Sequence, residues 1–585
     1  MAEIIPIRLP ENIDVGSLNS KLTNEDTNGS SYRKRRDKEM DENYTLYRNK
    51  VRINRLTQRQ PLNIPLMKET IKTLVSKTNA PIHINFKNKD GDLDKEIYIK
   101  TLWNDTVKKD AINLKARVDK KNCYLYGRGH MSLEVDPNFS NLIRLGIRDP
   151  FDITIDPETS PWDVNSARFY SEGNIFKPLN DVMHNPRFDK DARVLLGSEY
   201  QGNVGKNSDA YKRKMERILA MGYYNTGNQQ WGTDNADSLV KLTYHCTHIW
   251  DEKQKQYIKY YVVRADDKHI LRAAPHKDVF GVDFWLLESW AEDLEGIDYW
   301  SDGIGDIVRV PNKAINTWIS QYMENRTLAS FGMNLYDSTN TDFKPSEFDA
   351  KAWAWYPLPG KPNDVYKRLD IPELKGTLQD IQFVVNMAER ASATGSLEKG
   401  AVEDVKRTLG EVEIAVSNAL ERTNDIAPLY NSAYERIAEK WYHLVVANMA
   451  KKNITLYKEN PDEQVTSRTI TAQDIHSKNG YEITSEDKAQ ADLENVDEIT
   501  RLRAGRELFP NNAAMRKAEQ RRFVRLLNLT PQEVDEIEQE EVENAEQQLQ
   551  TIAQPSPYLP QAPTPQLASP QSNPQVQQPG LRNVI

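Results

Sequence analysis

The sequence predicts a protein of the α+β class, with long helices and short strands in different stretches of the chain. Two stretches, residues 311–331 and 409–449, repeat apolar side chains every three or four residues, as helices do. Shorter stretches between residues 64 and 263 alternate apolar and polar side chains, which is typical of half-buried strands. At 585 residues the chain is too long for one hydrophobic core, so we expect several domains.

The composition excludes some classes of protein. No run approaches the ~20 consecutive apolar residues of a membrane span, and the N-terminus lacks the basic-then-apolar order of a signal peptide. These features predict a soluble, unexported chain without membrane contact. Cys123 and Cys246 are too few for a disulfide framework and fit a reducing cytoplasm. The net charge of −9 argues against a protein that grips nucleic acid over its whole surface, although it permits local basic patches.

The N-terminal residues are polar, and residues 1–31 predict a flexible arm. A helical pattern begins at Tyr32 and carries the basic cluster Arg33–Arg36. This cluster could contact nucleic acid. With Asp37 and Glu39 nearby, a solvated helix end is the favoured interpretation.

Residues 32–300 mix helix patterns with strand–turn–strand patterns. Residues 81–99 alternate around an Asp-Gly-Asp turn and predict a hairpin, and residues 238–263 predict another. In the latter, Cys246 and His248 point to the same face, which raises the hypothesis of a metal site. We disfavour zinc because it usually takes four ligands and no second pair lies nearby, so we expect the edge of a β-meander.

The chain contains no recognisable catalytic motif. The loop around Lys206 lacks the glycine and the hydroxyl side chain of a phosphate-binding loop, because Tyr200 and Asn207 stand at those positions. Carboxylates cluster at residues 149–156, where a glycoside hydrolase could place its acid pair, but two Asp-Pro steps indicate loop corners instead. We therefore predict no catalytic residue, no metal and no cofactor.

Two predicted helices flank a small module. Residues 301–332 predict the first helix, in which Pro311 suits the first turn and Gly332 suits the end. Residues 373–393 predict the second. Between them, residues 333–372 contain five prolines and few helix signals, which predicts strands and turns. The apolar stripe expected on the first helix consists of Ala314, Ile315, Trp318, Ile319, Tyr322 and Met323.

A charged segment, residues 394–408, leads into the very long helical pattern of residues 409–449. Pro428 interrupts the middle of this pattern. Because a proline donates no backbone hydrogen bond and its ring crowds the carbonyl four residues before it, we expect the helix to kink there. The Pro/Gln-rich residues 553–585, with Arg582 as the one charged side chain, predict a disordered tail.

The order of helix, small module, helix, charged loop and long kinked helix resembles the portal proteins of tailed bacteriophages. The local passages that carry the resemblance are GRGHMSLEV, DPFDITIDPETSPWD followed by ARFYSE, DGIGDIVRVPNKAINTWISQYMENR and TGSLEKGAVEDVKRTLGEVEIAVSNALERTNDIAPLY. The resemblance implies a portal fold with a wing, a helical stem, a small α/β clip, a long kinked channel helix and a helical crown. It assigns residues 32–300 to the wing, 301–332 to the first stem helix, 333–372 to the clip, 373–393 to the second stem helix, 394–408 to a tunnel loop, 409–500 to the channel helix and the return to the wing, and 501–552 to crown-like helices.

The resemblance also implies a function without catalysis. A portal is a dodecameric ring at one capsid vertex of the virion, assembled in the host cytoplasm, through which double-stranded DNA is packaged and ejected. The implied partners are further copies of the chain, the terminase large subunit, the major capsid and scaffolding proteins, and the head-completion, adaptor or tail proteins. A negatively charged subunit fits a conduit that lets DNA slide better than a clamp that holds it.

The tunnel-loop candidate carries charges of both signs. Lys399, Lys406 and Arg407 are the residues we expect to contact phosphates transiently. The alternative is that they pair with neighbouring carboxylates such as Glu398 and Glu403. Two other functions also stay open: a carbohydrate-active hydrolase, which the long kinked helix argues against, and a helical scaffold outside viruses.

Overall fold

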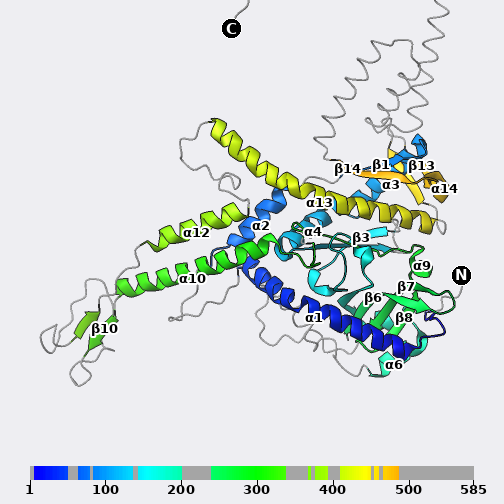
Figure 1. Cartoon of the computed structure of the whole chain (residues 1–585), viewed down its shortest axis with the longest axis horizontal. Helices are drawn as coiled ribbons and strands as arrows, with labels where there is room; N and C mark the ends of the chain where they lie inside the picture. Colours follow the sequence, from blue (N-terminus) through cyan, green and yellow to red (C-terminus); the bar gives the residue numbers. More distant parts are fainter. Residues whose placement is uncertain are drawn as a thin grey trace, which may run out of the picture. The chain divides into compact units, whose positions relative to one another are not determined.

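The computed structural model places helices and strands in one mixed assembly, consistent with the α+β class (Figure 1). The chain divides into two compact units, Met1–Glu498 and Ile499–Ile585, and every described residue belongs to the former. The predicted tunnel loop, crown-like helices and C-terminal tail lie outside the described residues. The structure describes residues 6–49, 63–78, 83–135, 143–199, 239–294, 296–331, 333–336, 366–369, 376–392, 409–449, 454–459 and 465–486.

A five-stranded antiparallel sheet forms the first part of the fold. Its strands, in spatial order, are β4 (Ile153–Ile155), β5 (Phe169–Pro178), β6 (Leu239–Asp251), β7 (Gln256–Ala265) and β8 (His269–Pro275). The predicted hairpin of β6 and β7 is confirmed, with Asp251 opposite Gln256 beside the turn. The expected edge position is wrong, because β6 lies between β5 and β7. Being covered on both faces, β6 buries Cys246 on one face and Ile249 on the other.

Helix α1 (Val15–Tyr47) covers one face of this sheet. The Asp14 side chain caps it by accepting a hydrogen bond from the Ser17 backbone N–H at 3.0 Å. Leu18 and Leu22 are fully buried against the sheet, and the backbone N–H of Arg8 donates to a carbonyl of β8. The expectation of a flexible arm over residues 1–31 is therefore wrong for the described residues. The leucines that recur in this polar stretch pack against the apolar face of the sheet.

Smaller sheets connect distant parts of the chain. Strand β2 (Gly129–Val135) lies between β3 (Ile143–Ile147) and β9 (Leu287–Trp290). Strand β1 (His83–Asn88) pairs with β14 (Tyr481–Glu486). The hairpin predicted over residues 81–99 is thus wrong.

The Asp-Gly-Asp step begins helix α3 (Leu93–Lys109) instead of a second strand. The Asp92 side chain accepts from the Lys95 backbone N–H at 3.4 Å, so the aspartate acts as a helix cap. Acidic residues in the first turn, Asp94 and Glu96, add favourable interactions with the helix dipole. An aspartate before an alternating segment therefore signalled a helix start rather than a hairpin turn.

The largest core gathers around helix α13 (Leu409–Met449). Ile437, Trp441 and Leu444, which recur at four- and three-residue steps within the predicted helical pattern of residues 409–449, are buried there. The Trp441 ring meets the Trp103 ring edge-on, with 5.0 Å between centroids. Pro428 lies inside the helix, which continues beyond it to Met449, and the kink stays a prediction.

Helices α10 (Ile304–Phe331) and α12 (Thr377–Ala391) lie side by side (Figure 1). The expectation that Pro311 lies in the first helical turn is wrong. Pro311 lies about two turns inside α10. The strands β10 (Met333–Tyr336) and β11 (Tyr366–Leu369) pair antiparallel, and the rest of residues 333–372 lies outside the described part.

Shorter elements complete the description. The remaining helices are α2 (Leu66–Lys77), α4 (Ile112–Tyr126), α5 (Leu179–Met183), α6 (Lys190–Glu199), α9 (His276–Phe280) and α14 (Ala472–Ile475), with 3-10 turns at Pro150–Asp152 and Val164–Ser166. Strands β12 (Ile454–Glu459) and β13 (Val465–Ile470) form one further antiparallel pair. Within the described part of the chain, no helix has the length and hydropathy that crossing a bilayer requires.

Candidate functional site

Two charged helix faces meet where α1 packs beside the start of α10. On α1 the charged side chains recur at three- and four-residue steps, and on α10 they do the same, so each set lies on one side of its helix. The two sets form a continuous network of ion pairs, which we call the junction ladder. Its members are Arg35, Arg36, Glu39 and Glu42 from α1, and Asp302, Asp306, Arg309 and Lys313 from the start of α10 and the residues before it.

Arg36 is the buried centre of the junction ladder, with 6% of its surface exposed. Its Nη1 lies 2.7 Å from Glu39 Oε2 and 2.8 Å from Asp302 Oδ1. Its Nη2 lies 2.9 Å from Asp306 Oδ2 and donates to the Tyr126 carbonyl at 3.0 Å. A planar guanidinium can satisfy acceptors from several segments at once, which a lysine cannot do.

Asp306 holds the other side of the junction ladder. Burial alone would raise the pKa of its carboxyl group, but Arg36 and several hydrogen bonds outweigh burial and hold the pKa below its ordinary value. The donors include Asn43 Nδ2 at 2.9 Å, Arg309 Nη1 at 2.7 Å and the Gly303 backbone N–H at 2.9 Å. The carboxylate stays ionised and ties the first turn of α10 to α1.

Three carboxylates of the junction ladder, Glu39, Asp302 and Asp306, are close enough to hold a cation, with ligand atoms within 4.8 Å of one another. The Arg36 guanidinium contacts all three. It therefore already supplies the positive charge that a metal ion would bring. The arrangement is an internal ion-pair network and does not define a metal centre.

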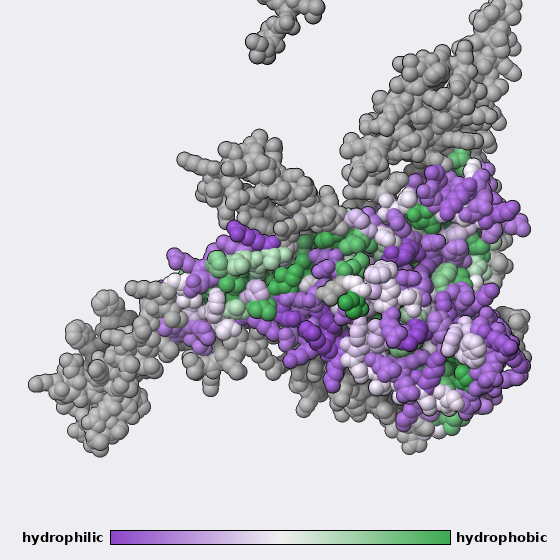
Figure 2. Space-filling view, viewed as in Figure 1, coloured by the Kyte–Doolittle hydropathy of each residue, from purple (hydrophilic) through white to green (hydrophobic). Residues whose placement is uncertain are grey.

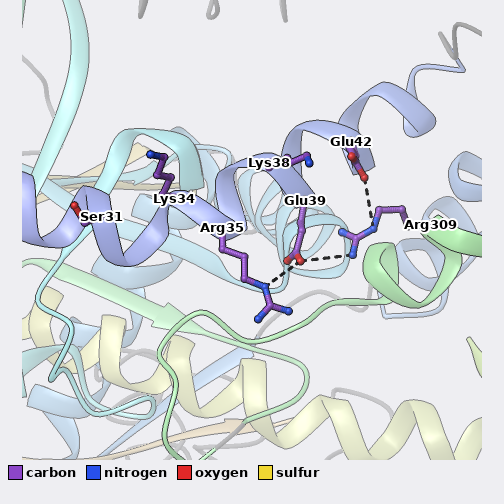
Figure 3. A pocket seen from close by; sticks show the side chains of 7 residues that line it. All are labelled: Ser31, Lys34, Arg35, Lys38, Glu39, Glu42 and Arg309. Carbon is purple, nitrogen blue, oxygen red and sulfur yellow. Dashed lines mark hydrogen bonds and ion pairs between the residues drawn. The ribbon is translucent and has the colours of Figure 1, made fainter.

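The outer side of the junction ladder opens into a cleft of about 640 Å³ (Figure 3). Glu39 lies between two arginines, with Arg35 Nε at 3.4 Å and Arg309 Nη2 at 3.8 Å from its Oε1. Glu42 is held by Lys313 at 2.6 Å and by Arg309 at 3.9 Å. The residues lining the cleft are Ser31, Lys34, Arg35, Lys38, Glu39, Glu42 and Arg309.

The predicted basic cluster divides between the two sides of α1. Arg33 and Arg36 are buried, and Arg33 donates to backbone carbonyls beside β4, including that of Pro150 at 3.2 Å. The interpretation of the whole cluster as a solvated helix end is therefore wrong. Lys34 and Arg35 are the two members that face solvent.

A second surface feature lies on the α10–α12 pair. Ile381 and Ala388 of α12 are buried, whereas Phe383 is 64% and Met387 is 55% exposed on the opposite side of the helix. On α10, Met323 is 47% exposed although the predicted stripe contains it. Figure 2 shows hydrophobic residues gathered over these helices.

Lys399, Lys406 and Arg407 lie outside the described residues. Asp149 caps a 3-10 turn, and Asp156 binds Arg168 with 2.6 Å between Oδ2 and Nε, so the interpretation of this cluster as loop corners is confirmed.

Cys246 packs into a core, and burial raises the pKa of its thiol to about 12. A thiol protonated at neutral pH is a poor metal ligand. Among the described residues, Cys246 and His248 do not belong to any group that could hold a metal ion.

Neither a scan against protein-family models nor a search of curated proteins returns a match for this chain.

Proposed function

We propose that this chain is the subunit of a phage portal: a dodecameric ring at one capsid vertex that conducts DNA and docks the terminase and the head-completion or tail proteins. The proposal rests on the resemblance in element order and on one structural observation. That observation is the α10–α12 pair, which joins through the β10–β11 ladder and leaves apolar side chains uncovered. No catalytic role is part of the proposal.

The two-sided character of α12 supports a ring. One side of the helix buries Ile381 and Ala388, and the other exposes Phe383 and Met387. A helix with apolar side chains on opposite sides is stable in water when both sides are covered. In a ring, one side would contact the same chain and the other a second copy. The proposed ring requires the exposed side to meet a different surface of the next copy, which is a heterologous contact, and heterologous contacts can close into rings.

The junction ladder supports a rigid connection between the helix pair and the body. Asp306 in the first turn of α10 binds Arg36 and Asn43 of α1, so the start of α10 is fixed by buried polar contacts. A protein is strongly destabilised when one partner of a buried charge pair is lost. The junction ladder therefore favours one orientation of α10 against α1. In a conduit through which DNA is moved by force, the α10–α12 pair must keep a fixed angle to the rest of the subunit.

The decisive experiment is a mass measurement combined with one substitution pair. Light scattering after size exclusion is expected to give a ring of about twelve parent chains. Phe383→Asp with Met387→Asp is expected to give folded monomers, because two charges cannot be buried at an apolar contact without large cost. Val194→Asp on α6, where the parent valine is 59% exposed, is the control and should leave rings intact. A monomeric parent chain would overturn the proposal.

A further inference from the structure

The outer face of α1 carries a row of polar side chains, Ser31, Lys34, Arg35 and Lys38, which we call the basic stripe. The steps of three, four and seven residues place all four on one face of the helix, over about 10 Å. All four are exposed, and all four line the cleft in Figure 3. The opposite face of the same helix segment is buried, so the backbone beneath the basic stripe is held in place.

The charge of the cleft is positive on balance. Glu39 and Glu42 are both engaged by cations of the junction ladder. Among the described residues, no carboxylate lies within salt-bridge distance of Lys34 or Lys38, although Lys38 is near enough to Glu42 to help lower the pKa of that carboxyl group. Arg35 uses its Nε toward Glu39, and its side chain is 89% exposed, which leaves its terminal nitrogens directed to solvent. Three cations are therefore available to an incoming anion.

The composition of the cleft discriminates between classes of polyanion. Its lining contains no apolar and no aromatic side chain. Protein partners usually bind through buried apolar or aromatic anchors, and single-stranded nucleic acids bind through aromatic stacking. Contacts to the sugar–phosphate backbone of a duplex need only cations and hydroxyl groups. We infer that the basic stripe binds the phosphates of duplex DNA without reading its sequence.

The dimensions fit a short contact. One strand of B-DNA advances about 3.4 Å along the axis for each phosphate, so a stripe of about 10 Å matches roughly three phosphates. Three cations then face three anions. Binding to a single chain is expected to be weak and steeply dependent on salt, with a slope of roughly −0.9 per neutralised phosphate. This contact is separate from the one proposed for the tunnel loop.

The test measures fluorescence anisotropy of a short labelled duplex with the full chain over a series of NaCl concentrations. Lys34→Gln with Lys38→Gln is expected to weaken binding about tenfold at low salt and to make the salt slope less negative by roughly 2. Lys268→Gln with Lys277→Gln removes the same charge from exposed positions near β8 and is the matched control. The control is expected to bind DNA like the parent chain.

Three results would overturn the inference: unchanged binding by the Lys34 and Lys38 variant, equal loss in the control, or competition by polyglutamate as effective as that by unlabelled duplex. The last result would indicate an acidic polypeptide as the partner. Light scattering on the same samples reports the ring separately. If the Lys34 and Lys38 variant forms rings and binds DNA like the parent, only the inference about the basic stripe is wrong. If the parent chain is monomeric, only the portal proposal is wrong.

Discussion

Glu288 of β9 and Arg436 of α13 form an ion pair, with 2.9 Å between Oε1 and Nε, in which the Arg436 side chain is partly exposed. Glu288 is fully buried, and Lys440, one turn further along α13, approaches its Oε2 at 2.8 Å. Both cations also donate to backbone carbonyls of β9. One carboxylate therefore fixes the long helix to the sheet.

Removing this carboxylate is expected to destabilise the chain strongly. Glu288→Ala leaves Lys440 and Arg436 without their anion, and breaking a buried pair costs about 3–5 kcal/mol. Urea unfolding measures the loss. Replacing Lys440 with Met in the same background should recover part of the stability, because one unpaired buried charge is removed. A loss below about 1 kcal/mol would show that the cations find other partners.

Gly127 is expected to tolerate no side chain. Its φ is +91°, and a Cβ there would lie 1.9 Å from the Ser301 carbonyl oxygen. We expect Gly127→Ala to lower the free energy of unfolding by more than about 3 kcal/mol, since both strain and overlap arise. Gly91→Ala is the control, because φ is +77° but no atom lies within 4 Å of the added Cβ. That change should cost about 1 kcal/mol, and equal effects at both sites would contradict the role of the close contact.

Glu292 is expected to make stability depend on pH. Burial raises the pKa of this carboxyl group from 4.5 to about 7. The folded chain therefore holds the proton more tightly than the unfolded chain, and the resulting stabilisation is complete below about pH 4.5 and disappears as the pH rises through 7. Glu292→Gln lacks this dependence. We therefore expect the free energy of unfolding of the variant, minus that of the parent, to be larger at pH 8 than at pH 4 by up to about 3 kcal/mol.

Urea unfolding of both chains at several pH values measures this difference. Glu252→Gln, an exposed site in the turn after β6, makes the same charge change and is the control. A stability difference between Glu292→Gln and the parent that stays constant with pH would refute the assignment.

The tunnel-loop prediction is tested by DNA packaging. Replacing Lys399, Lys406 and Arg407 together with Ala should leave ring assembly intact, because exposed charges typically contribute within ~0.5 kcal/mol each. Loss of charge-assisted phosphate contacts should reduce packaged or retained DNA. Counting full and empty particles by cryo-EM, together with the ring mass, separates the outcomes. Normal packaging would remove these residues as DNA contacts, and failed rings would place them in a subunit interface.

The fold was predictable where the pattern is local. The periodic stretches around Trp318 and Trp441 form α10 and α13, and the hairpin of β6 and β7 follows its alternation. Strand pairing was not predictable where the partners are distant. Residues 81–99 resemble a hairpin in pattern, but β1 pairs with β14 because the second half of that segment is capped as a helix.

The sequence by itself determined that α1 carries adjacent basic residues, and that no catalytic motif accompanies them. Only the tertiary structure decided that Arg36 is a buried centre of ion pairs while Lys34 faces a cleft. The two residues stand two positions apart on a helix, which turns them about 200° from each other. Which of them is buried depends on the side from which α10 and the sheet approach, and that direction is set by residues far along the chain.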